Sequence, residues 1–572
     1  MAWTGTVRAV PHEARTHHVT MRDGVRLATD IYLPETHDGA LASILIRLPY
    51  GKTSDYCFPD LIAHRLVARG YVCVVQDVRG KFDSQGETFG LLSEASDGYD
   101  TLDWITEQPW SNGRVGMFGD SYYGFTQWAA ASTSHPALRA IVPRVTTHDF
   151  AGLPHQPEPT VADPPWLTFG TYLQQCWVDG ALNERTIDFE VRPLADAFEA
   201  AFRELGARSP WFDQFVHGPL RAPVFPFGDP IDARPIPVLH TVGWYDNLAI
   251  ASLRSYARFA ADPAWGPLQY LFADSIDHEN YHLDHVRSRP ENDHATMGPK
   301  VMDTLLDRYI EPAIDFFDVF VRESSDAQDH PRVRWHHGHD GYRTATTWPP
   351  QQARRTELYL DALDRAAGEG GVLSYVDPAA EQRVSWAYDP EDLVPSGDVD
   401  TWSLLRVSPD EASVGERPDV LRFDLPPVEE ELDLAGPVDL WVAVDSTAER
   451  TDVFAKLLDV APDGRATQIV RGQGTLLRPA PDAEVRIEMG HIGLRLRRGH
   501  RVRLQLASSD YPEYVPSTGD DRNPWTATER HRSTQTLHIT RATPARLTLT
   551  VLHGTQTTDV TGAIAPRARI DS

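Results

Sequence analysis

Two hydrophobic patterns alternate along the first 145 residues. Short runs that are alternating or continuously apolar, as in strands, are separated by amphipathic segments that favour helices. The expected strands are residues 17–21, 25–33, 43–47, 71–76, 114–118 and 140–145, and the expected helices are residues 60–68, 97–107 and 125–131. Strands that alternate with helices in this way predict a mainly parallel α/β sheet.

This pattern is interrupted at about residue 148 and returns at about residue 235. Residues 148–234 are rich in Pro and aromatic residues and contain an amphipathic run at 193–205, which predicts an inserted helical cap. The α/β pattern then resumes with strands at 237–243 and 269–272 and helices at 252–260 and 302–321. We therefore assign residues 1–147 and 235–354 to the two parts of one α/β domain.

The helical pattern disappears after residue 355. Alternating runs such as 356–360, 438–444 and 502–506 are separated there by turns of Gly, Pro and Asp. Many short strands joined by such turns are typical of a β-sandwich or jelly roll. Residues 355–572 are thus predicted to form a separate β domain, which is a jelly roll.

Ser121 lies at the expected junction between the strand at 114–118 and the helix that follows it. The surrounding run is Gly-Met-Phe-Gly-Asp-Ser-Tyr-Tyr-Gly, residues 116–124. A serine at a strand-to-helix turn is typical of a nucleophile elbow, in which backbone N–H groups of the helix can stabilise an oxyanion. Gly124 comes three residues after the serine rather than the usual two, so this run alone also fits an ordinary turn.

Asp246 and His278 stand where the partners of a nucleophilic serine are expected. A serine nucleophile needs a base and an acid that orients the base, in the chain order Ser, acid, His. Asp246 follows the strand at 237–243 and His278 follows the strand at 269–272, and ligand-facing groups collect at such strand ends. The alternative for Asp246 is the N-cap of the helix that follows.

Clustered histidines leave a metal site as an alternative. One tract contains His278, His282 and His285 together with Asp277, Glu279 and Asp284. This spacing would suit ligands on a helix, and the run Trp-His-His-Gly-His-Asp at 335–340 is a second candidate. Because His278 directly follows a strand end, where a triad base belongs, we favour the triad and expect no metal or cofactor.

Composition and charge bear on the partners and the cellular location that are expected for this protein. The 572 residues carry 54 Lys and Arg against 82 Asp and Glu, a net charge of −28, which argues against nucleic-acid or anionic-membrane partners. The three cysteines, Cys57, Cys73 and Cys176, are expected to be buried, reduced thiols. Without a signal-peptide core or an 18-residue apolar run, a cytoplasmic protein is expected, and a homodimer is one arrangement compatible with the chain.

Several further stretches make the sequence resemble the cocaine esterase/NonD family of acyl hydrolases, which is related to the X-Pro dipeptidyl peptidases and the α-amino-acid ester hydrolases. The stretches that carry the resemblance are residues 47–50, 76–80, 116–127, 243–246, 342–350 and 452–460. They cover nearly the whole chain and are weakest in the cap. The resemblance implies an α/β-hydrolase domain with an inserted helical cap and a C-terminal jelly-roll domain.

The resemblance also implies a role for each candidate residue. Ser121 would be the nucleophile, Asp246 the acid and His278 the base. The Tyr50 hydroxyl and the Tyr122 backbone N–H would form the oxyanion hole, since both can point at one developing negative charge.

The chain matches the family pattern Gly-x-Ser-Tyr-x-Gly, which accounts for Gly124, but departs from the family at two other places. The family usually has Gly-Pro-Trp before the histidine, whereas residues 274–277 are Asp-Ser-Ile-Asp. The residue before the serine is usually small or apolar, yet here it is Asp120. Asp120 either raises the pKa of the triad histidine or points away into a polar loop.

The residues after Asp246 bear on the substrate. The α-amino-acid ester hydrolases carry an acidic pair there that holds an ammonium group, whereas residues 247–249 are Asn-Leu-Ala, so a free α-amine is not the expected handle. An apolar acyl pocket is expected instead, although core packing is the alternative for each of its members. The candidates are Trp166, Phe169 and Tyr172 from the cap and Trp402, Leu404 and Leu405 from the β domain.

The expected activity is therefore that of a serine carboxylesterase for small-molecule esters with an apolar or aromatic acyl group. An amidase or X-Pro-type aminopeptidase of the same superfamily is the nearest alternative. A metal-dependent hydrolase or a non-catalytic ligand-binding protein would be an alternative from a different class.

Overall fold

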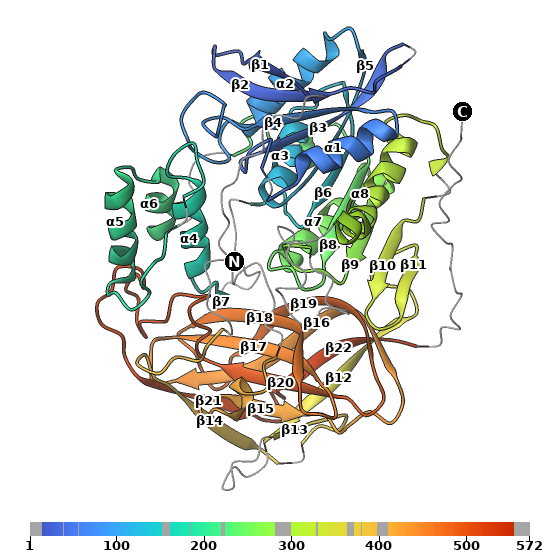
Figure 1. Ribbon diagram of the computed structural model, residues 1–572. Coiled ribbons are helices and arrows are strands. Elements are labelled where there is room, and N and C mark those ends of the chain that lie inside the picture. Colours follow the sequence, from blue (N-terminus) through green and yellow to red (C-terminus); the bar gives the residue numbers. More distant parts are fainter. Residues whose placement is uncertain are drawn as a thin grey trace.

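The computed structural model contains two large sheets, one at each end of the molecule, with a helical cap beside them (Figure 1). It describes residues 14–37, 39–54, 56–150, 161–183, 185–218, 224–280, 299–327, 330–362, 371–378, 380–396 and 410–553. The first sheet and its helices form the α/β domain, and the second sheet forms the β domain.

The sheet of the α/β domain has ten strands in the order β1-β2-β4-β3-β5-β6-β8-β9-β10-β11. The strands are β1 (Ala14–Thr20), β2 (Arg26–Tyr32), β3 (Leu41–Leu48), β4 (Val72–Asp77), β5 (Ser111–Asp120), β6 (Leu138–Arg144), β8 (Val238–Gly243), β9 (Gln269–Asp274), β10 (Val333–His337) and β11 (Gly341–Ala345). Neighbouring strands from β4 to β10 are parallel, and β1, β2 and β11 add antiparallel pairs at the edges. The predicted α/β class is confirmed.

Helices cover both faces of this sheet because its central strands are apolar on both faces. Ile44 of β3 and Phe118 of β5 belong to one buried cluster, and their neighbours Leu45 and Met117 belong to another on the opposite face. The first cluster includes residues of α1 and α8, and the second includes residues of α2 and α7. The helices are α1 (Pro59–Ala68), α2 (Glu94–Thr106), α3 (Ser121–Ser132), α7 (Ala249–Ala261) and α8 (Pro299–Phe320).

The cap lies between β6 and β8 in the chain and contains α4 (Leu167–Cys176), α5 (Leu194–Leu205) and α6 (Pro210–Val216). The amphipathic run predicted at 193–205 is α5, which buries Phe198 and Phe202. The segment is not purely helical, because β7 (Val161–Ala162) pairs with β18 of the β domain. The cap therefore contacts both large domains, as its position in Figure 1 also shows.

The β domain follows residue 350 and contains, apart from β7, eleven of the described strands. They are β12 (Ala353–Asp361), β13 (Gly371–Ser374), β14 (Gln382–Tyr388), β15 (Leu421–Asp424), β16 (Leu432–Ser446), β17 (Arg450–Val460), β18 (Ala466–Leu477), β19 (Glu484–Leu496), β20 (Arg501–Ala507), β21 (Ser533–Ile539) and β22 (Arg546–Leu552). Strands β13 and β15 are parallel and the other paired strands of this sheet are antiparallel, and most of the buried apolar residues belong to one large cluster. The β-rich class is thus confirmed, while the jelly-roll topology stays a prediction.

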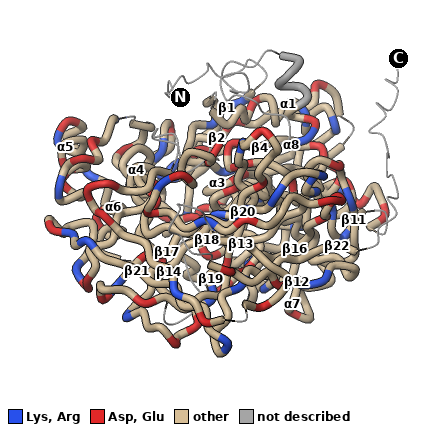
Figure 2. The backbone as a smooth tube through the Cα atoms, turned by 90° about the horizontal axis from the view of Figure 1, so that it is seen from below, with Lys and Arg blue, Asp and Glu red and all other residues tan. Residues whose placement is uncertain are grey.

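Charged residues of both signs are interspersed along the backbone rather than separated by domain (Figure 2). Cys57, Cys73 and Cys176 are buried and free, and burial raises the pKa of each thiol. Among the described residues, no helix is both long enough and apolar enough to cross a bilayer.

Candidate active site

Ser121 occupies a sharp turn between β5 and α3. It is the first residue of the helix and has a φ of 51°, a left-handed conformation that is uncommon for a residue with a side chain. Its side chain is partly exposed, whereas the residues on either side are buried. The Thr146 hydroxyl donates to the Ser121 carbonyl at 2.6 Å and so supports the turn. This strand-turn-helix geometry is that of a nucleophile elbow.

Two glycines beside Ser121 are required by close packing. A Cβ on Gly119 would lie 2.0 Å from the Tyr123 ring, and a Cβ on Gly124 would lie 2.4 Å from the Thr146 side chain. Gly124 therefore lets the first turn of α3 approach the loop after β6, which explains why its late position suits this elbow.

Asp246 and His278 meet at the carboxyl ends of the neighbouring parallel strands β8 and β9. His278 Nδ1 lies 2.6 Å from Asp246 Oδ1, and both side chains are buried. Helix α7 begins at Ala249 with Leu248 as its N-cap, so the N-cap alternative for Asp246 is wrong. The contact at Nδ1 leaves Nε2 as the histidine nitrogen that can accept a proton.

The surroundings of His278 raise its pKa. Burial alone would lower this pKa, but the charge of Asp246 and its hydrogen bond favour the protonated ring. The carboxylates of Asp120 and Asp277 add to that effect, and the resulting pKa lies above the ordinary value of 6.5. The histidine is therefore a stronger base than a free imidazole.

Tyr50 lies two residues after β3 with its hydroxyl 3.3 Å from the Tyr172 hydroxyl of the cap. Its ring packs edge-on against Tyr56 and Tyr123, with ring centroids 5.8 and 6.1 Å apart. Burial raises the pKa of Tyr50 well above its usual value, and the neighbours Tyr172, Cys176 and Tyr56 add to the rise. The phenol therefore stays protonated and can donate a hydrogen bond.

The Tyr122 side chain points away from the catalytic groups. Its hydroxyl donates to Glu94 at 2.8 Å and accepts the Leu91 N–H at 2.7 Å, and Glu94 is paired with Arg47 at 2.8 Å. These contacts anchor the first turn of α3, where backbone N–H groups have no intrahelical acceptor. The role of Glu94 could not be found from the sequence, because it depends on a hydrogen bond to Tyr122, a residue 28 positions later in the chain.

Asp120 is the last residue of β5 and does not point into a polar loop, so that one of its two alternatives is wrong. Its carboxylate is buried and accepts a hydrogen bond from Arg144 Nε at 2.9 Å. Its effect on the pKa of His278 agrees with the other alternative. The available signal was Arg144 itself, a cation that directly follows the apolar run of residues 140–143 in β6.

The cap residues expected in the acyl pocket form a column of stacked rings. Tyr514 of the β domain stacks on Trp166 at 6.2 Å, Trp166 on Phe169 at 6.2 Å, and Phe169 on Tyr172 at 5.5 Å. The column thus runs from the β domain to the hydroxyl of Tyr50. Trp402, Leu404 and Leu405 lie outside the described residues.

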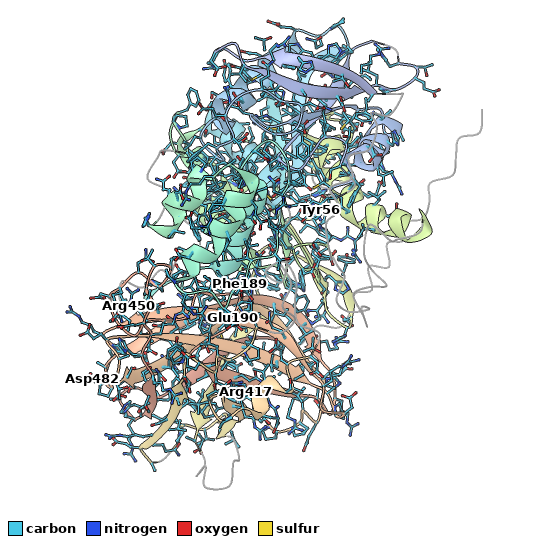
Figure 3. All side chains as sticks on the ribbon, turned by 60° about the vertical axis from the view of Figure 1, so that its left-hand side comes forward. Tyr56, Phe189, Glu190, Arg417, Arg450 and Asp482 are labelled. Atoms are coloured by element: carbon cyan, nitrogen blue, oxygen red, sulfur yellow. The ribbon has the colours of Figure 1, made fainter. Side chains whose placement is uncertain are left out.

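Figure 3 shows where the cap meets its neighbours. Tyr56 lies on the side of the α/β domain, and Phe189 and Glu190 lie where the cap approaches the β domain. The Tyr511 hydroxyl of the β domain donates to the Phe189 carbonyl. The cap is therefore fixed to the β domain by hydrogen bonds as well as by stacked rings.

Of the two candidate metal-binding segments, the structure describes the first only in part and places residues of the second in a strand. His282, His285 and Asp284 lie outside the described residues. Residues 335–337 belong to β10, where His336 contacts the Ser275 hydroxyl at 2.8 Å and His337 pairs with Asp433 at 3.1 Å. In the described part of the chain, no group of three or more His, Cys, Asp or Glu residues is arranged to hold a metal ion.

Sequence comparisons agree with this geometry. The X-Pro dipeptidyl-peptidase (S15 family) profile matches residues 23–280, and the profile of the X-Pro dipeptidyl-peptidase C-terminal non-catalytic domain matches residues 325–548. The chain is 31% identical over 547 residues to the cocaine esterase of Rhodococcus sp. (strain MB1 Bresler), covering 87% of this chain and 90% of that one.

Solved structures share the whole architecture. An α-amino acid ester hydrolase superposes with a TM-score of 0.75 at 24% identity, covering 96% of this chain and 98% of that one. An aminopeptidase from a marine sediment Thaumarchaeota archaeon has a TM-score of 0.74 at 21% identity, with 95% and 98% covered. A CocE/NonD family hydrolase from Staphylococcus aureus has a TM-score of 0.63 at 17% identity, with 94% and 93% covered. The chain belongs to the cocaine esterase/NonD family of S15 serine hydrolases.

Proposed function

We propose that this enzyme is a serine carboxylesterase that hydrolyses small esters with an apolar or aromatic acyl group. The observation that carries the proposal is the 2.6 Å contact between Asp246 and His278 at the carboxyl ends of β8 and β9, in the same sheet whose strand β5 leads into the elbow of Ser121. The 31% identity to a cocaine esterase supports an ester as the substrate.

In the proposed acylation step, the Ser121 hydroxyl attacks the ester carbonyl while His278 Nε2 takes its proton. Asp246 keeps the proton on Nδ1 and stabilises the imidazolium that forms. The oxyanion of the tetrahedral intermediate accepts hydrogen bonds from the Tyr50 hydroxyl and the Tyr122 N–H. The bond between the acyl carbon and the alcohol oxygen then breaks, and His278 gives its proton to the departing alcohol.

Deacylation repeats these steps with water. His278 takes a proton from water, which attacks the acyl carbon bound to Ser121. When the second tetrahedral intermediate collapses, the serine oxygen recovers the proton and the carboxylic acid leaves. Apart from the ester and water, the proposed reaction uses only side chains and backbone groups of this chain.

The preference for an apolar acyl group rests on the column of rings that ends at Tyr50. Phe169 and Tyr172 are buried and uncharged and come from a helix that lies over the proposed oxyanion hole. Flat apolar groups bind well against aromatic faces, and such walls hold small ligands in most enzyme pockets. An aromatic acyl group should therefore bind better than an acetyl group.

An X-Pro aminopeptidase is the second candidate, and Glu279 favours it. The pKa of Tyr56 is raised by burial and also by the Glu279 carboxylate, which places that carboxylate close to Tyr56 and so to its ring neighbour Tyr50. A carboxylate next to the triad histidine could hold the ammonium of a peptide N-terminus. Asn247 and Leu248, which follow the triad acid, supply no such charge and favour the esterase.

The test compares p-nitrophenyl acetate, butyrate and benzoate with an X-Pro p-nitroanilide. We expect ester hydrolysis that is fastest for the benzoate, is lost in Ser121→Ala and is retained in Ser132→Ala, a matched change at the other end of the same helix. Full activity in Ser121→Ala would exclude the proposal. Higher kcat/KM for the anilide, lowered by Glu279→Gln, would favour the peptidase.

A further inference from the structure

A closed ring of hydrogen bonds joins three buried side chains from three separate parts of the α/β domain. Asp120 ends β5, Arg144 ends β6, and Asn280 lies in the loop after β9. Arg144 Nε donates to Asp120 Oδ1 at 2.9 Å, and Arg144 Nη2 donates to Asn280 Oδ1 at 2.8 Å. Asn280 Nδ2 donates to Asp120 Oδ2 at 3.0 Å and closes the ring.

The ring is rigid and shielded from water. Asp120, Arg144 and Asn280 are 6%, 3% and 7% exposed. The Arg144 guanidinium lies 4.2 Å from the centre of the Tyr309 ring, and the Tyr309 hydroxyl bonds that of Tyr123 at 3.2 Å. Charge-assisted hydrogen bonds at low exposure hold their geometry more firmly than bonds in water.

Two of the three ring residues adjoin catalytic groups of the proposed mechanism. Asp120 directly precedes Ser121, and Asn280 closes a turn around His278, in which its N–H donates to the Asp277 carbonyl at 3.1 Å. The start of this loop is held separately, because the Tyr245 N–H donates to the Ile276 carbonyl. Asp246 fixes one nitrogen of the histidine, whereas the ring fixes the loop that carries it.

We propose that Asp120, Arg144 and Asn280 are positioning residues that hold His278 at the distance and angle from Ser121 that proton transfer requires. The inference rests on the proposed roles of Ser121 and His278. The ring joins the residue before the serine to the loop that carries the histidine, so it connects the proposed nucleophile and base directly. A misplacement of about 1 Å at such a pair can lower a rate about a hundredfold.

The ring also sets the charge around His278. The carboxylates that act on the histidine are Asp246, Asp120 and Asp277. Among the described residues, the cations bonded to members of the ring are Arg144, which donates to Asp120, and Arg308, whose Nη2 lies 3.4 Å from the Asn280 carbonyl oxygen. Neutralising Asp120 would leave Arg144 without its counter-charge, so the histidine would lose its proton at a lower pH.

The test measures the rate at which a fluorophosphonate labels Ser121, because labelling needs the serine and its base but no particular ester. Asp120→Asn keeps the shape of the side chain but sets two amide donors against each other in the ring. Asn280→Ala removes one member without changing the charge. Asp424→Asn, which breaks the 2.7 Å pair with Arg503 in the β domain, is the matched control.

We expect Asp120→Asn and Asn280→Ala each to slow labelling about ten- to a hundredfold. The double variant should be little slower than the worse single variant, because both changes break one ring. Asp120→Asn should also shift the pH midpoint of labelling downward, and Asp424→Asn should change neither quantity.

Wild-type labelling rates in both ring variants would overturn the proposal. So would losses that are additive and leave the pH midpoint unchanged, as a merely structural role predicts. If Asp120→Asn does not fold, the test rests on Asn280→Ala. Slower labelling of this variant at an unchanged melting temperature supports the proposal, and labelling at the wild-type rate overturns it. Fast labelling of a wild type that cleaves no ester, slowed by the ring variants, would refute the proposed substrate but support the ring.

Discussion

Removing the Tyr50 hydroxyl should lower kcat far more than it lowers stability. In the proposed mechanism this hydroxyl is one of two donors to the oxyanion. Tyr50→Phe removes that donor and keeps the ring, whose edge contacts with Tyr56 and Tyr123 at 5.8 and 6.1 Å fill the same space. The variant therefore isolates one hydrogen bond from the packing around it.

The size of the effect follows from the two environments of the hydroxyl. In the free enzyme the Tyr50 hydroxyl bonds the Tyr172 hydroxyl at 3.3 Å, a long bond whose loss should cost less than about 1 kcal/mol of folding free energy. In the transition state it would face a full negative charge in a buried site, and loss of one such donor costs about 3 kcal/mol. We expect kcat to fall about a hundredfold or more with little change in KM.

The assay is steady-state hydrolysis of p-nitrophenyl benzoate, with active sites counted by phosphonate titration. Tyr172→Phe is the matched control, because it removes the partner hydroxyl but leaves the donor, and its kcat should fall less than about tenfold. A Tyr50→Phe enzyme with kcat within threefold of wild type would refute the role of Tyr50. A larger loss of kcat in Tyr172→Phe than in Tyr50→Phe would indicate that the Tyr172 hydroxyl of the cap, and not that of Tyr50, donates to the oxyanion.

Other parts of the structure give further expectations. Because Asp246 raises the pKa of His278, kcat/KM should rise with pH through a midpoint above 6.5, and a midpoint below 6.5 in a rate profile would contradict this. Glu94→Ala should lower the free energy of unfolding by about 3 kcal/mol in urea denaturation, because Arg47 stays buried without its 2.8 Å partner. Gly119→Ala should yield little folded protein on gel filtration, since its Cβ would lie 2.0 Å from a ring. Incubation with EDTA should leave ester hydrolysis unchanged, whereas loss that Zn²⁺ restores would favour the metal alternative.

Regular elements and chain order could be predicted because their signals are local. Hydrophobic periodicity located α5, α7 and the parallel strands from β3 to β9 to within a few residues of their observed ends, but it did not locate the parallel strand β10. The order of Ser121, Asp246 and His278 along strand ends was enough to expect their proximity, because parallel strands bring those ends to one edge of a sheet.

Contacts between distant residues could not be predicted, since no local pattern encodes them. Asp120 is an example, because its partner Arg144 lies 24 residues away and Asn280 lies 160 residues away. Asp246 shows the limit of a local rule, because its position before a helix suggested an N-cap as the alternative to the triad acid, whereas the side chain contacts His278. The histidines at 336, 337 and 339 suggested a metal site, but His336 and His337 belong to β10 and have tertiary partners there.

Mass spectrometry of the enzyme quenched during turnover tests the central claim most directly. The wild type is mixed with p-nitrophenyl benzoate, quenched in acid within the first turnovers and digested. We predict a benzoyl mass increase on the peptide that carries Ser121. It should be absent from Ser121→Ala and strongly reduced in His278→Ala, because the latter lacks the base that activates the serine. A wild type that turns over ester with no acyl group on Ser121, or with the acyl group on another residue, would contradict the account.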